Sequence, residues 1–149
     1  MFKRILVATD GSALSEQAVA KAIDLSVLTG AELFAVTVAH LEPHSYFDGS
    51  TVLLNDREIE ESRHRSVAAA QKLVDAVKSA ALAKGVRSAE AVVMKSNLVA
   101  ESIVDVAKTH ECDLIVMASH GRRGLTRLLM GSETLHVLTH SHTPVLVLR

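Results

Sequence analysis

The chain has 149 residues, of which 48% are apolar and 22% are charged, and its formal net charge is -1. A chain of this length can build one domain with a hydrophobic core but not two ordinary ones, so we expect residues 1–149 to form a single domain. The near-zero charge favours neither nucleic acid nor an acidic surface as a partner, so any anion site must be local. No run of about 18 apolar residues indicates a membrane span, and no secretory signal is evident, so the cytoplasm is the expected location.

The make-up of the core follows from what the sequence lacks. Trp is absent and aromatic residues make up only 3% of the chain, so the core must consist of Val, Leu, Ile and Ala. Aliphatic cores of this kind suit parallel sheets covered by helices. The single cysteine, Cys112, excludes an intramolecular disulfide framework. It lies in an apolar stretch, where a buried inert thiol is the main interpretation and a redox sensor is the alternative.

Periodicity and turn residues divide the chain into alternating strands and helices. In chain order, the sequence predicts a strand over 4–8, a helix over 13–29, a strand over 31–39, a helix over 57–84, a strand over 88–94, a helix over 98–110, a strand over 113–118, a helix over 132–141 and a strand over 143–148. Asn97 is the predicted N-cap of the third helix. Residues 40–56, which include Tyr46 and Phe47, show no clear period, and a loop this long could serve as a lid.

This alternation predicts an α/β fold, in which a parallel sheet carries helices on both faces. In such sheets, ligands bind beyond the carboxyl ends of the strands, where the strand order reverses. Three loops leave carboxyl ends and carry side chains suited to a ligand, namely residues 9–12, 38–56 and 118–132. The sequence therefore predicts a ligand site formed by these loops.

The strongest local signal is the segment from Met117 to Ser132, which begins MASHGRRG and ends MGS. Gly121 lets backbone N–H groups approach a ligand without a Cβ between them. Gly131 and Ser132 stand at a predicted helix start, where unpaired N–H groups and the positive end of the helix dipole attract phosphate. The arginines of the segment add positive charge: Arg122, Arg123 and Arg127. A Gly-Ser pair that simply caps a helix is the alternative interpretation.

Three features together resemble the universal stress protein family: VATDGS near the start, the Gly-x9-Gly-Ser segment after the fourth predicted strand, and the closing TPVLVL strand. The match covers essentially the whole chain. The resemblance implies an open five-stranded parallel sheet in the order 3-2-1-4-5, the adenine-nucleotide alpha-hydrolase-like fold. It also implies a homodimer formed partly by pairing of the last strands, Thr143–Leu148.

ATP-binding members of the family share a Gly-x2-Gly-x9-Gly-Ser/Thr pattern, which here corresponds to Ala118-Ser119-His120-Gly121, nine residues, and Gly131-Ser132. Alanine replaces the first glycine of that pattern. The added Cβ is a small obstacle if Ala118 keeps a negative φ, and a serious one if the site needs a left-handed backbone. The rest of the pattern is intact, so the resemblance implies ATP, with Mg²⁺, as the bound cofactor.

By the same resemblance, Asp10 contacts the nucleotide and the backbone of Val38 reads the adenine edge. A turn-forming role for Asp10 is the alternative. Glu133 suits the first turn of a helix, but it would repel a triphosphate unless it faces solvent or Mg²⁺ intervenes. The full set of predicted nucleotide-binding residues is Asp10, Val38, Met117, Ala118, His120, Gly121, Arg122, Arg123, Gly131, Ser132, Glu133 and Thr134.

The histidines offer further chemistry. His120 could bond a phosphate, act as a weak general base or order the loop. His136 and His140 have the i, i+4 spacing of a metal-binding pair, but no acidic or cysteine partner is evident nearby, and positive charge is common at the end of a helix. We therefore predict no metal-ligating side chain.

These features predict an ATP-binding regulatory protein of the stress response, in which the nucleotide sets the conformation, the dimer state or the choice of an unidentified protein partner. We expect little or no hydrolysis, because the sequence has no dedicated base and no Walker motif. One alternative is a dimeric interaction module that has lost nucleotide binding, which only Ala118 favours. Another is an enzyme, such as a slow ATPase or an adenylate-forming ligase, but the loop after the first strand lacks the glycines that such a ligase needs.

Overall fold

The computed structural model describes residues 1–41, 55–121 and 130–149. The predictions for Arg122, Arg123 and Arg127, and for the loop that contains Tyr46 and Phe47, therefore lie outside the described residues. Within the described ranges, no helix combines the length and the apolar character needed to cross a membrane.

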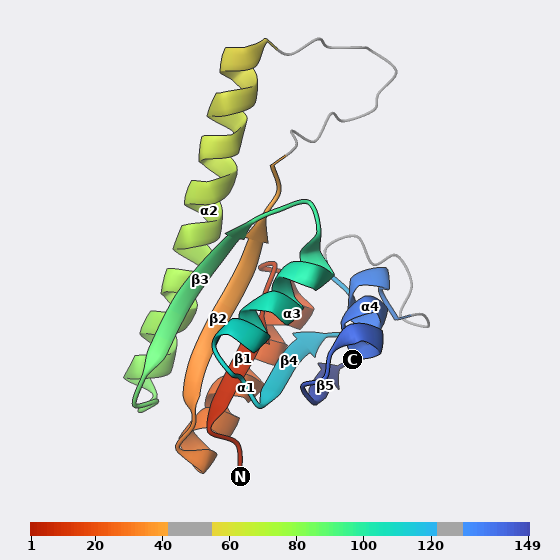
Figure 1. Ribbon diagram of the computed structural model, residues 1–149. Helices are drawn as coiled ribbons and strands as arrows, with labels where there is room; N and C mark the ends of the chain where they lie inside the picture. Colours follow the sequence, from red (N-terminus) through yellow and green to blue (C-terminus); the bar gives the residue numbers. More distant parts are fainter. Residues whose placement is uncertain (42–54, 122–129) are drawn as a thin grey trace.

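Strands and helices alternate along the described chain: β1 (Arg4–Ala8), α1 (Ala13–Thr29), β2 (Glu32–Ala39), α2 (Asp56–Ala83), β3 (Ala89–Lys95), α3 (Val99–Thr109), β4 (Leu114–Ala118), α4 (Ser132–His140) and β5 (Val145–Leu148). The strands form a five-stranded sheet in the order β3-β2-β1-β4-β5, and each neighbouring pair is parallel (Figure 1). The prediction of a parallel sheet in the order 3-2-1-4-5 is therefore confirmed.

Helices cover both faces of this sheet, as the alternation predicts (Figure 1). On one face, α1 and α2 contribute the buried side chains of Ala18, Ala22, Ile23, Val74, Val77 and Ala81. On the other face, α3 and α4 contribute those of Ala100, Ile103, Val106, Ala107 and Val137. Both layers consist of small aliphatic side chains, so the scarcity of aromatic residues does not prevent a continuous core on either side of the sheet.

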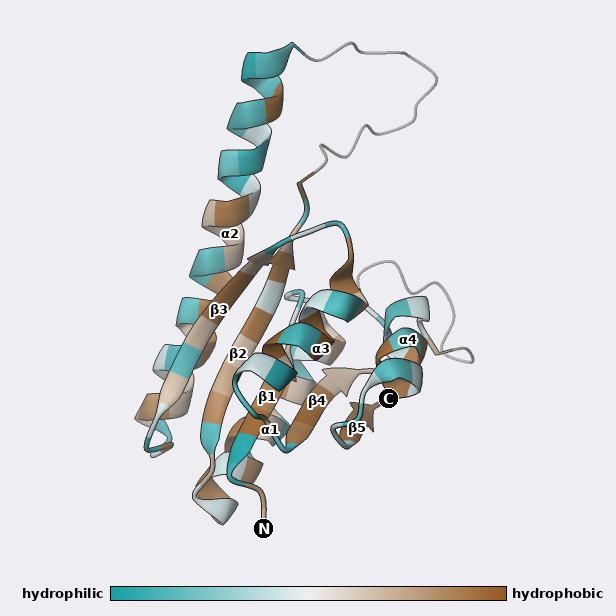
Figure 2. Ribbon diagram, in the orientation of Figure 1, coloured by the Kyte–Doolittle hydropathy of each residue, from teal (hydrophilic) through white to brown (hydrophobic). Residues whose placement is uncertain are grey.

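The long helix α2 extends beyond the sheet that it covers. Its 28 residues span about 42 Å at 1.5 Å per residue. Its buried residues all lie in the second half, at Ala70, Val74, Val77 and Ala81. The first half projects past the carboxyl ends of β2 and β3 and is mostly hydrophilic (Figure 2). This half needs no apolar stripe, because it has no part of the sheet to cover.

Many predicted element boundaries differ by one or two residues from those of the structure, and hydrogen bonds explain the difference at the start of α3 and at the start of β5. Asn97 is not the N-cap of α3, as the sequence predicts; the N-cap is Leu98, which makes no side-chain cap bond. The Asn97 side chain instead accepts a hydrogen bond from the Leu41 amide, just beyond the end of β2. β5 begins at Val145 rather than at Thr143, because the Thr143 amide donates to a serine hydroxyl in a local turn.

The Cys112 thiol is buried among the apolar side chains of the α3/α4 face, where 6% of the residue is exposed. Burial, assisted by the negative charge of Asp113, raises the pKa of the thiol to about 12. A thiol with that pKa is almost fully protonated near neutral pH, whereas the thiolate is the reactive form. The structure therefore favours the inert thiol over the redox sensor.

We predict that Cys112 resists alkylation by iodoacetamide in the folded protein near neutral pH. Labelling should rise only as urea unfolds the chain, because unfolding both exposes the thiol and returns its pKa to the ordinary range. Mass spectrometry of samples quenched across a urea series measures the modified fraction. Labelling of the folded protein as fast as the unfolded chain would contradict the prediction.

Candidate functional site

The predicted site lies at the point where the strand order reverses. β1 and β4 are neighbours in the sheet, with Val7 opposite Val116, and the chain leads from β1 toward one edge and from β4 toward the other. Asp10 follows the carboxyl end of β1, and Ser119 follows that of β4. Ligands of open α/β sheets bind at such a reversal point. The fold therefore brings two of the predicted loops to one place.

A chain of hydrogen bonds shapes the turn between β1 and α1. The Ser15 hydroxyl donates to the Ser12 carbonyl (2.9 Å), so the Thr9 hydroxyl is the donor to Ser15 Oγ (3.0 Å). The Thr9 hydroxyl oxygen in turn accepts from the Gly11 amide (3.2 Å). Thr9 and Ser15 are buried, and this network holds the turn that carries Asp10.

Asp10 forms this turn and also reaches the loop after β4. Its Oδ1 accepts from the Ser12 amide (2.9 Å), which is the turn-forming bond. Its Oδ2 lies so close to Gly121 that an ideal Cβ on Gly121 would be 2.5 Å from it. With a Cβ at position 121, the end of the Asp10 side chain would have to move away, so glycine allows this close approach of the carboxylate. Asp10 therefore forms the turn, and its carboxylate also lies against the predicted phosphate loop.

The two ends of the loop after β4 are joined to each other. The Ser119 carbonyl accepts from the Gly131 amide (2.8 Å), and the Ser119 amide donates to the Leu148 carbonyl of β5 (2.7 Å). The buried Thr134 hydroxyl donates to the Ala118 carbonyl (3.0 Å). These bonds attach the start of α4 to the end of β4, which is itself bonded to the end of β5.

The start of α4 combines a bare N-cap with an exposed hydroxyl-bearing residue. Gly131 is the N-cap, and it supplies no side-chain bond to the first turn. An added Cβ on Gly131 would lie 3.3 Å from the Ser119 carbonyl oxygen and 3.3 Å from His120 Cα, so a side chain here would press on the backbone. Ser132 is the first helical residue, not the cap, and it is exposed. The N–H groups of the first turn, at the positive end of the helix dipole, can therefore receive an anion.

Ala118 has a backbone conformation that accommodates its Cβ. It is the last residue of β4, and it is paired with Leu148 of β5. Among the described non-glycine residues, positive φ occurs at Glu111 and not at Ala118. The alanine that replaces the first motif glycine therefore sits in an extended strand, where a Cβ causes no strain.

Glu133 and His120 both have partners within the protein. Glu133 Oε2 accepts from the Ala100 amide (2.9 Å), in the first turn of α3. His120 Nδ1 is 3.1 Å from the Ser119 hydroxyl oxygen, a hydrogen bond that orders this part of the loop. Glu133 is exposed, which agrees with the prediction that it faces solvent, and its bond to α3 is a contact that a local pattern does not reveal.

Val38 and Met117 stay predictions as nucleotide-binding residues. Val38 is the next-to-last residue of β2 and is half-buried. It follows Phe34 and Val36 at two-residue spacing, so its side chain is on the α3/α4 face of the sheet. Met117 is 6% exposed and packs in the core on that same face. Any contact of Met117 with a ligand would therefore involve its backbone rather than its side chain.

Three residues that shape the site were not singled out from the sequence: Thr9, Ser15 and Ser119. Each is buried, and each hydroxyl has a hydrogen-bond partner. Their positions in the sequence could have indicated this role, because Thr9 and Ser119 directly follow apolar strands and Ser15 lies in the first turn of α1. Small polar residues at such buried positions must find partners, and those partners are commonly the neighbouring turn.

The histidines of α4 contact an acidic residue that the sequence pattern does not reveal. The rings of His136 and His140 are in contact, with their centroids 4.2 Å apart and their planes tilted by 45°. His136 Nε2 lies 3.5 Å from a carboxylate oxygen of Glu101 in α3. In the part of the chain that the structure describes, no group of three or more His, Cys, Asp or Glu residues is placed to hold a metal ion.

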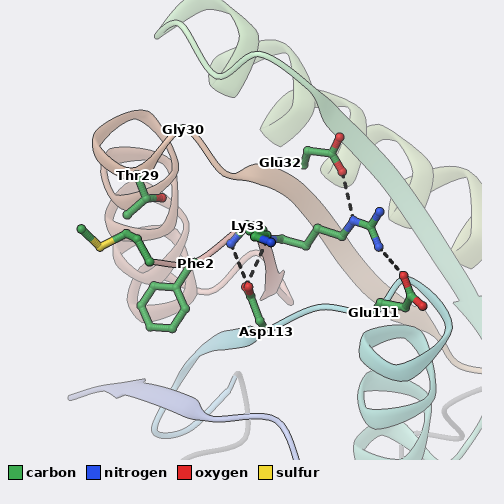
Figure 3. Close-up of a pocket in the computed structure, with 9 residues that line it drawn as sticks. Phe2, Lys3, Thr29, Gly30, Glu32, Glu111 and Asp113 are labelled. Carbon is green, nitrogen blue, oxygen red and sulfur yellow. Dashed lines mark hydrogen bonds and ion pairs between the residues drawn. The ribbon is translucent and has the colours of Figure 1, made fainter.

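A hollow of about 640 Å³ lies at the opposite, amino end of the strands, and several of its charged side chains bond to one another or to the backbone. The Arg4 guanidinium lies 2.7 Å from the Glu111 carboxylate and 3.4 Å from that of Glu32, the two carboxylates labelled in Figure 3. The hydrogen bond to Glu111 raises the pKa of Arg4 above its usual value. The Asp113 carboxylate accepts from the amides of Lys3 (2.8 Å) and Arg4 (3.1 Å). These groups fasten the start of β1 to its neighbours.

Comparison with known proteins identifies the family. The model of the universal stress protein family matches residues 1–149, which is the whole chain. The chain belongs to the universal stress protein family. Universal stress protein MJ0531 of Methanocaldococcus jannaschii is 32% identical over 151 aligned positions, which cover 100% of this chain and 83% of the relative.

Solved structures of universal stress proteins share the fold of this chain. UspA from Lactobacillus plantarum superposes with a TM-score of 0.82 and 24% identity, covering 99% of this chain and 97% of the other. A universal stress protein in complex with cAMP gives a TM-score of 0.68 at 23% identity, covering 99% and 97%. A universal stress protein from Archaeoglobus fulgidus in complex with dAMP gives 0.65 at 19% identity, covering 99% and 98%.

The bond between Thr134 and Ala118 provides a test of how the site is built. Thr134→Val keeps the shape of the side chain but removes the donor to a buried carbonyl, which should cost about 1–3 kcal/mol of stability. Thr139→Val is the matched control, because the exposed Thr139 hydroxyl makes the same kind of bond within α4, to the Leu135 carbonyl. Its loss should cost less than about 0.5 kcal/mol. Urea unfolding measures both values, and equal losses would contradict the role assigned to Thr134.

Proposed function

We propose that this chain is an ATP-binding regulatory protein of the stress response, with ATP and Mg²⁺ held at the carboxyl ends of β1 and β4. The observation that carries the proposal is a pair of close approaches at two glycines. Asp10 lies against Gly121, and the backbone of Ser119 and His120 lies against Gly131. Together they bring a carboxylate, a loop backbone and a helix start to one place at the reversal point of the sheet.

The start of α4 supports the binding of phosphates. Its N-cap has no side chain, so the first-turn N–H groups are not covered by a capping side chain. Ser132 adds a hydroxyl that can donate to a phosphate oxygen. Because the net charge of the chain is only -1, the attraction for an anion has to come from local donors of this kind.

The ligand class is supported by two related proteins and by the position of Val38. The universal stress proteins solved with cAMP and with dAMP each hold an adenine nucleotide. In this chain, β1 and β2 are parallel neighbours, so their carboxyl ends are adjacent and Val38 and Asp10 can contact the same ligand. We infer that the backbone of Val38 binds the adenine edge and that Asp10 binds the ribose or Mg²⁺.

A Mg²⁺ ion fits this arrangement. Mg²⁺ in nucleotide sites is held by one or two carboxylates together with the phosphates, and it keeps several waters. Asp10 is the carboxylate that stands at the predicted phosphate loop, whereas Glu133 is bonded to α3. The ion would neutralise part of the triphosphate charge at a site where the described residues supply mainly backbone donors.

We infer that the bound nucleotide regulates the protein rather than being consumed. A general base must lie within hydrogen-bond reach of the water that it activates. His120 is bonded to Ser119 through Nδ1, so its Nε2 is the nitrogen that could act as a base, and the sequence has no Walker motif. The rival function, an interaction module without nucleotide, depends on Ala118, whose extended backbone accommodates its Cβ. The regulated state would be the conformation, the dimer or the binding of an unidentified protein partner.

A matched pair of exchanges between glycine and alanine tests the nucleotide site. Mg·ATP should raise the melting temperature of the wild-type protein, because a ligand that binds only the folded state stabilises it by mass action. Ala118→Gly should keep the affinity within about twofold, since the backbone there needs no glycine. Gly121→Ala should lower the affinity roughly tenfold or more, since its Cβ would meet the Asp10 carboxylate at 2.5 Å. Isothermal titration calorimetry with Mg·ATP measures all three affinities.

Two results would count against the proposal. A wild-type protein with neither a thermal shift nor a binding heat in millimolar Mg·ATP would exclude the nucleotide site and favour the interaction module. Turnover of bound ATP well above the uncatalysed rate would instead favour a slow ATPase.

We also propose that a second copy of this chain is the dimer partner, paired through the last strand, Thr143–Leu148. β5 ends the strand order, so its outer edge has no neighbouring strand within the described chain. Apolar side chains surround this edge: Leu146 is 42% exposed, and Leu135 and Leu138 of α4 are 57% and 39% exposed. An exposed edge strand with apolar neighbours is a surface that natural proteins commonly cover.

We predict that Leu146→Lys converts the homodimer to a monomer, because a charge in the paired edge would be buried without a partner. Leu82→Lys, on α2, is the control, because Leu82 is 45% exposed and α2 packs on β2 and β3, at the other end of the strand order. Size-exclusion chromatography with light scattering gives the mass of each variant. A monomeric wild type at high concentration, or a Leu82→Lys protein that dissociates as readily as Leu146→Lys, would contradict pairing through β5.

A further inference from the structure

The start of α3 depends on a side chain from another helix. Its N-cap, Leu98, makes no side-chain cap bond, so α3 does not satisfy its own first-turn amides in the usual way. The carboxylate of Glu133, in the first turn of α4, accepts from the Ala100 amide at 2.9 Å. The two helix starts therefore share one acidic residue, and the bond joins residues 33 positions apart.

Two consecutive residues, Glu133 and Thr134, hold the first turn of α4 from two sides, next to the exposed Ser132. Thr134 is buried and donates to the Ala118 carbonyl at the end of β4. Glu133 bonds to Ala100 in α3. Ser132 is exposed and has the predicted contact with phosphate. A rotation of this turn that moved Ser132 would have to break the bond of Glu133 or that of Thr134.

The charge of Glu133 is balanced at the start of α3. The first turn of a helix carries the positive end of its dipole, and a carboxylate there is stabilised. A carboxylate next to Ser132 that faced the phosphates would instead repel them. The bond to Ala100 turns this negative charge away from the ligand and toward a helix end that lacks its own cap.

A second contact between the same helices supports a fixed arrangement. His136, one turn further along α4, has its Nε2 3.5 Å from the Glu101 carboxylate of α3. Each helix therefore presents one acidic residue to the other near their starts. Surface ion pairs of this kind contribute little alone, so the hydrogen bond of Glu133 to a backbone amide is the stronger of the two ties.

We propose that Glu133 is a positioning residue for phosphate binding: by accepting the Ala100 amide, it holds the first turn of α4 so that Gly131 and Ser132 face the phosphates. The inference rests on the proposed nucleotide site. If Glu133 has this role, the affinity for phosphate depends on the start of α3, and the Glu133 carboxylate strengthens the binding of a ligand that is also negatively charged. If Glu133 acted only by direct repulsion, it would weaken that binding.

Two variants separate these effects. Glu133→Ala removes the bond, and it should weaken Mg·ATP about tenfold while changing the affinity for adenosine, which has no phosphate, by less than about twofold. Glu133→Gln keeps a side-chain oxygen that can accept from the Ala100 amide, and it should stay within about threefold of the wild type for both ligands. Glu90→Ala, an exposed residue of β3, controls for the loss of one negative charge and should leave both affinities unchanged.

Calorimetry with Mg·ATP and with adenosine, on folded protein checked by circular dichroism, gives the affinities. Hydrogen exchange of the Ala100 amide without nucleotide should be faster in Glu133→Ala and near the wild-type rate in Glu133→Gln. Tighter binding of Mg·ATP by Glu133→Ala would overturn the inference, because the carboxylate would then act by repulsion. So would an equal loss for ATP and adenosine. A wild type that binds neither ligand would overturn the proposed function, and the inference with it.

Discussion

The backbone of Ser119 connects the sheet to the helix that the proposed ligand needs, and the rest of the site depends on it. Its amide donates to the Leu148 carbonyl and its carbonyl accepts from the Gly131 amide. One residue thus joins β4, β5 and the start of α4 through backbone groups, which have little freedom to rearrange. Because Ser119 is only 4% exposed, water does not compete for these bonds. The bare N-cap at Gly131 is therefore held at a fixed place above the sheet.

The bounds of a helix or strand could be predicted where residues next to it in the sequence mark its start and end. The apolar run of β1 and the 17-residue helix that follows begin and end where the sequence predicts, because turn residues and Gly30 mark their limits. Alternation predicts a parallel sheet but leaves many strand orders open, and the order 3-2-1-4-5 came from the family resemblance. The need for glycine at positions 121 and 131 could be predicted from the pattern. What each glycine approaches, Asp10 in one case and Ser119 and His120 in the other, is set by the fold.

The rest could not be predicted because it depends on partners that are distant in sequence. Asn97 has the composition of an N-cap, and a local reading assigns it to α3. In the folded chain its side chain bonds Leu41, 56 residues away, and the amide of α3 that needs an acceptor finds Glu133. From the sequence, solvent and phosphate were the only surroundings that could be considered for the Glu133 carboxylate. Each side chain takes the partner that tertiary packing brings near, and propensity does not rank such partners.

The helix starts give a reason to propose the site beside α4 rather than beside another helix at the carboxyl ends of the strands. All four described helices begin at the carboxyl ends of the strands, so all direct the positive ends of their dipoles to that side. The starts of α1 and α2 are capped by the side chains of Ser12 and Asn55, and that of α3 receives the carboxylate of Glu133. The start of α4 has Gly131 as its N-cap and no side-chain cap bond. An anion that approaches this edge therefore finds the least competition from side-chain acceptors at α4, where Ser132 is exposed and Asp10 stands across Gly121.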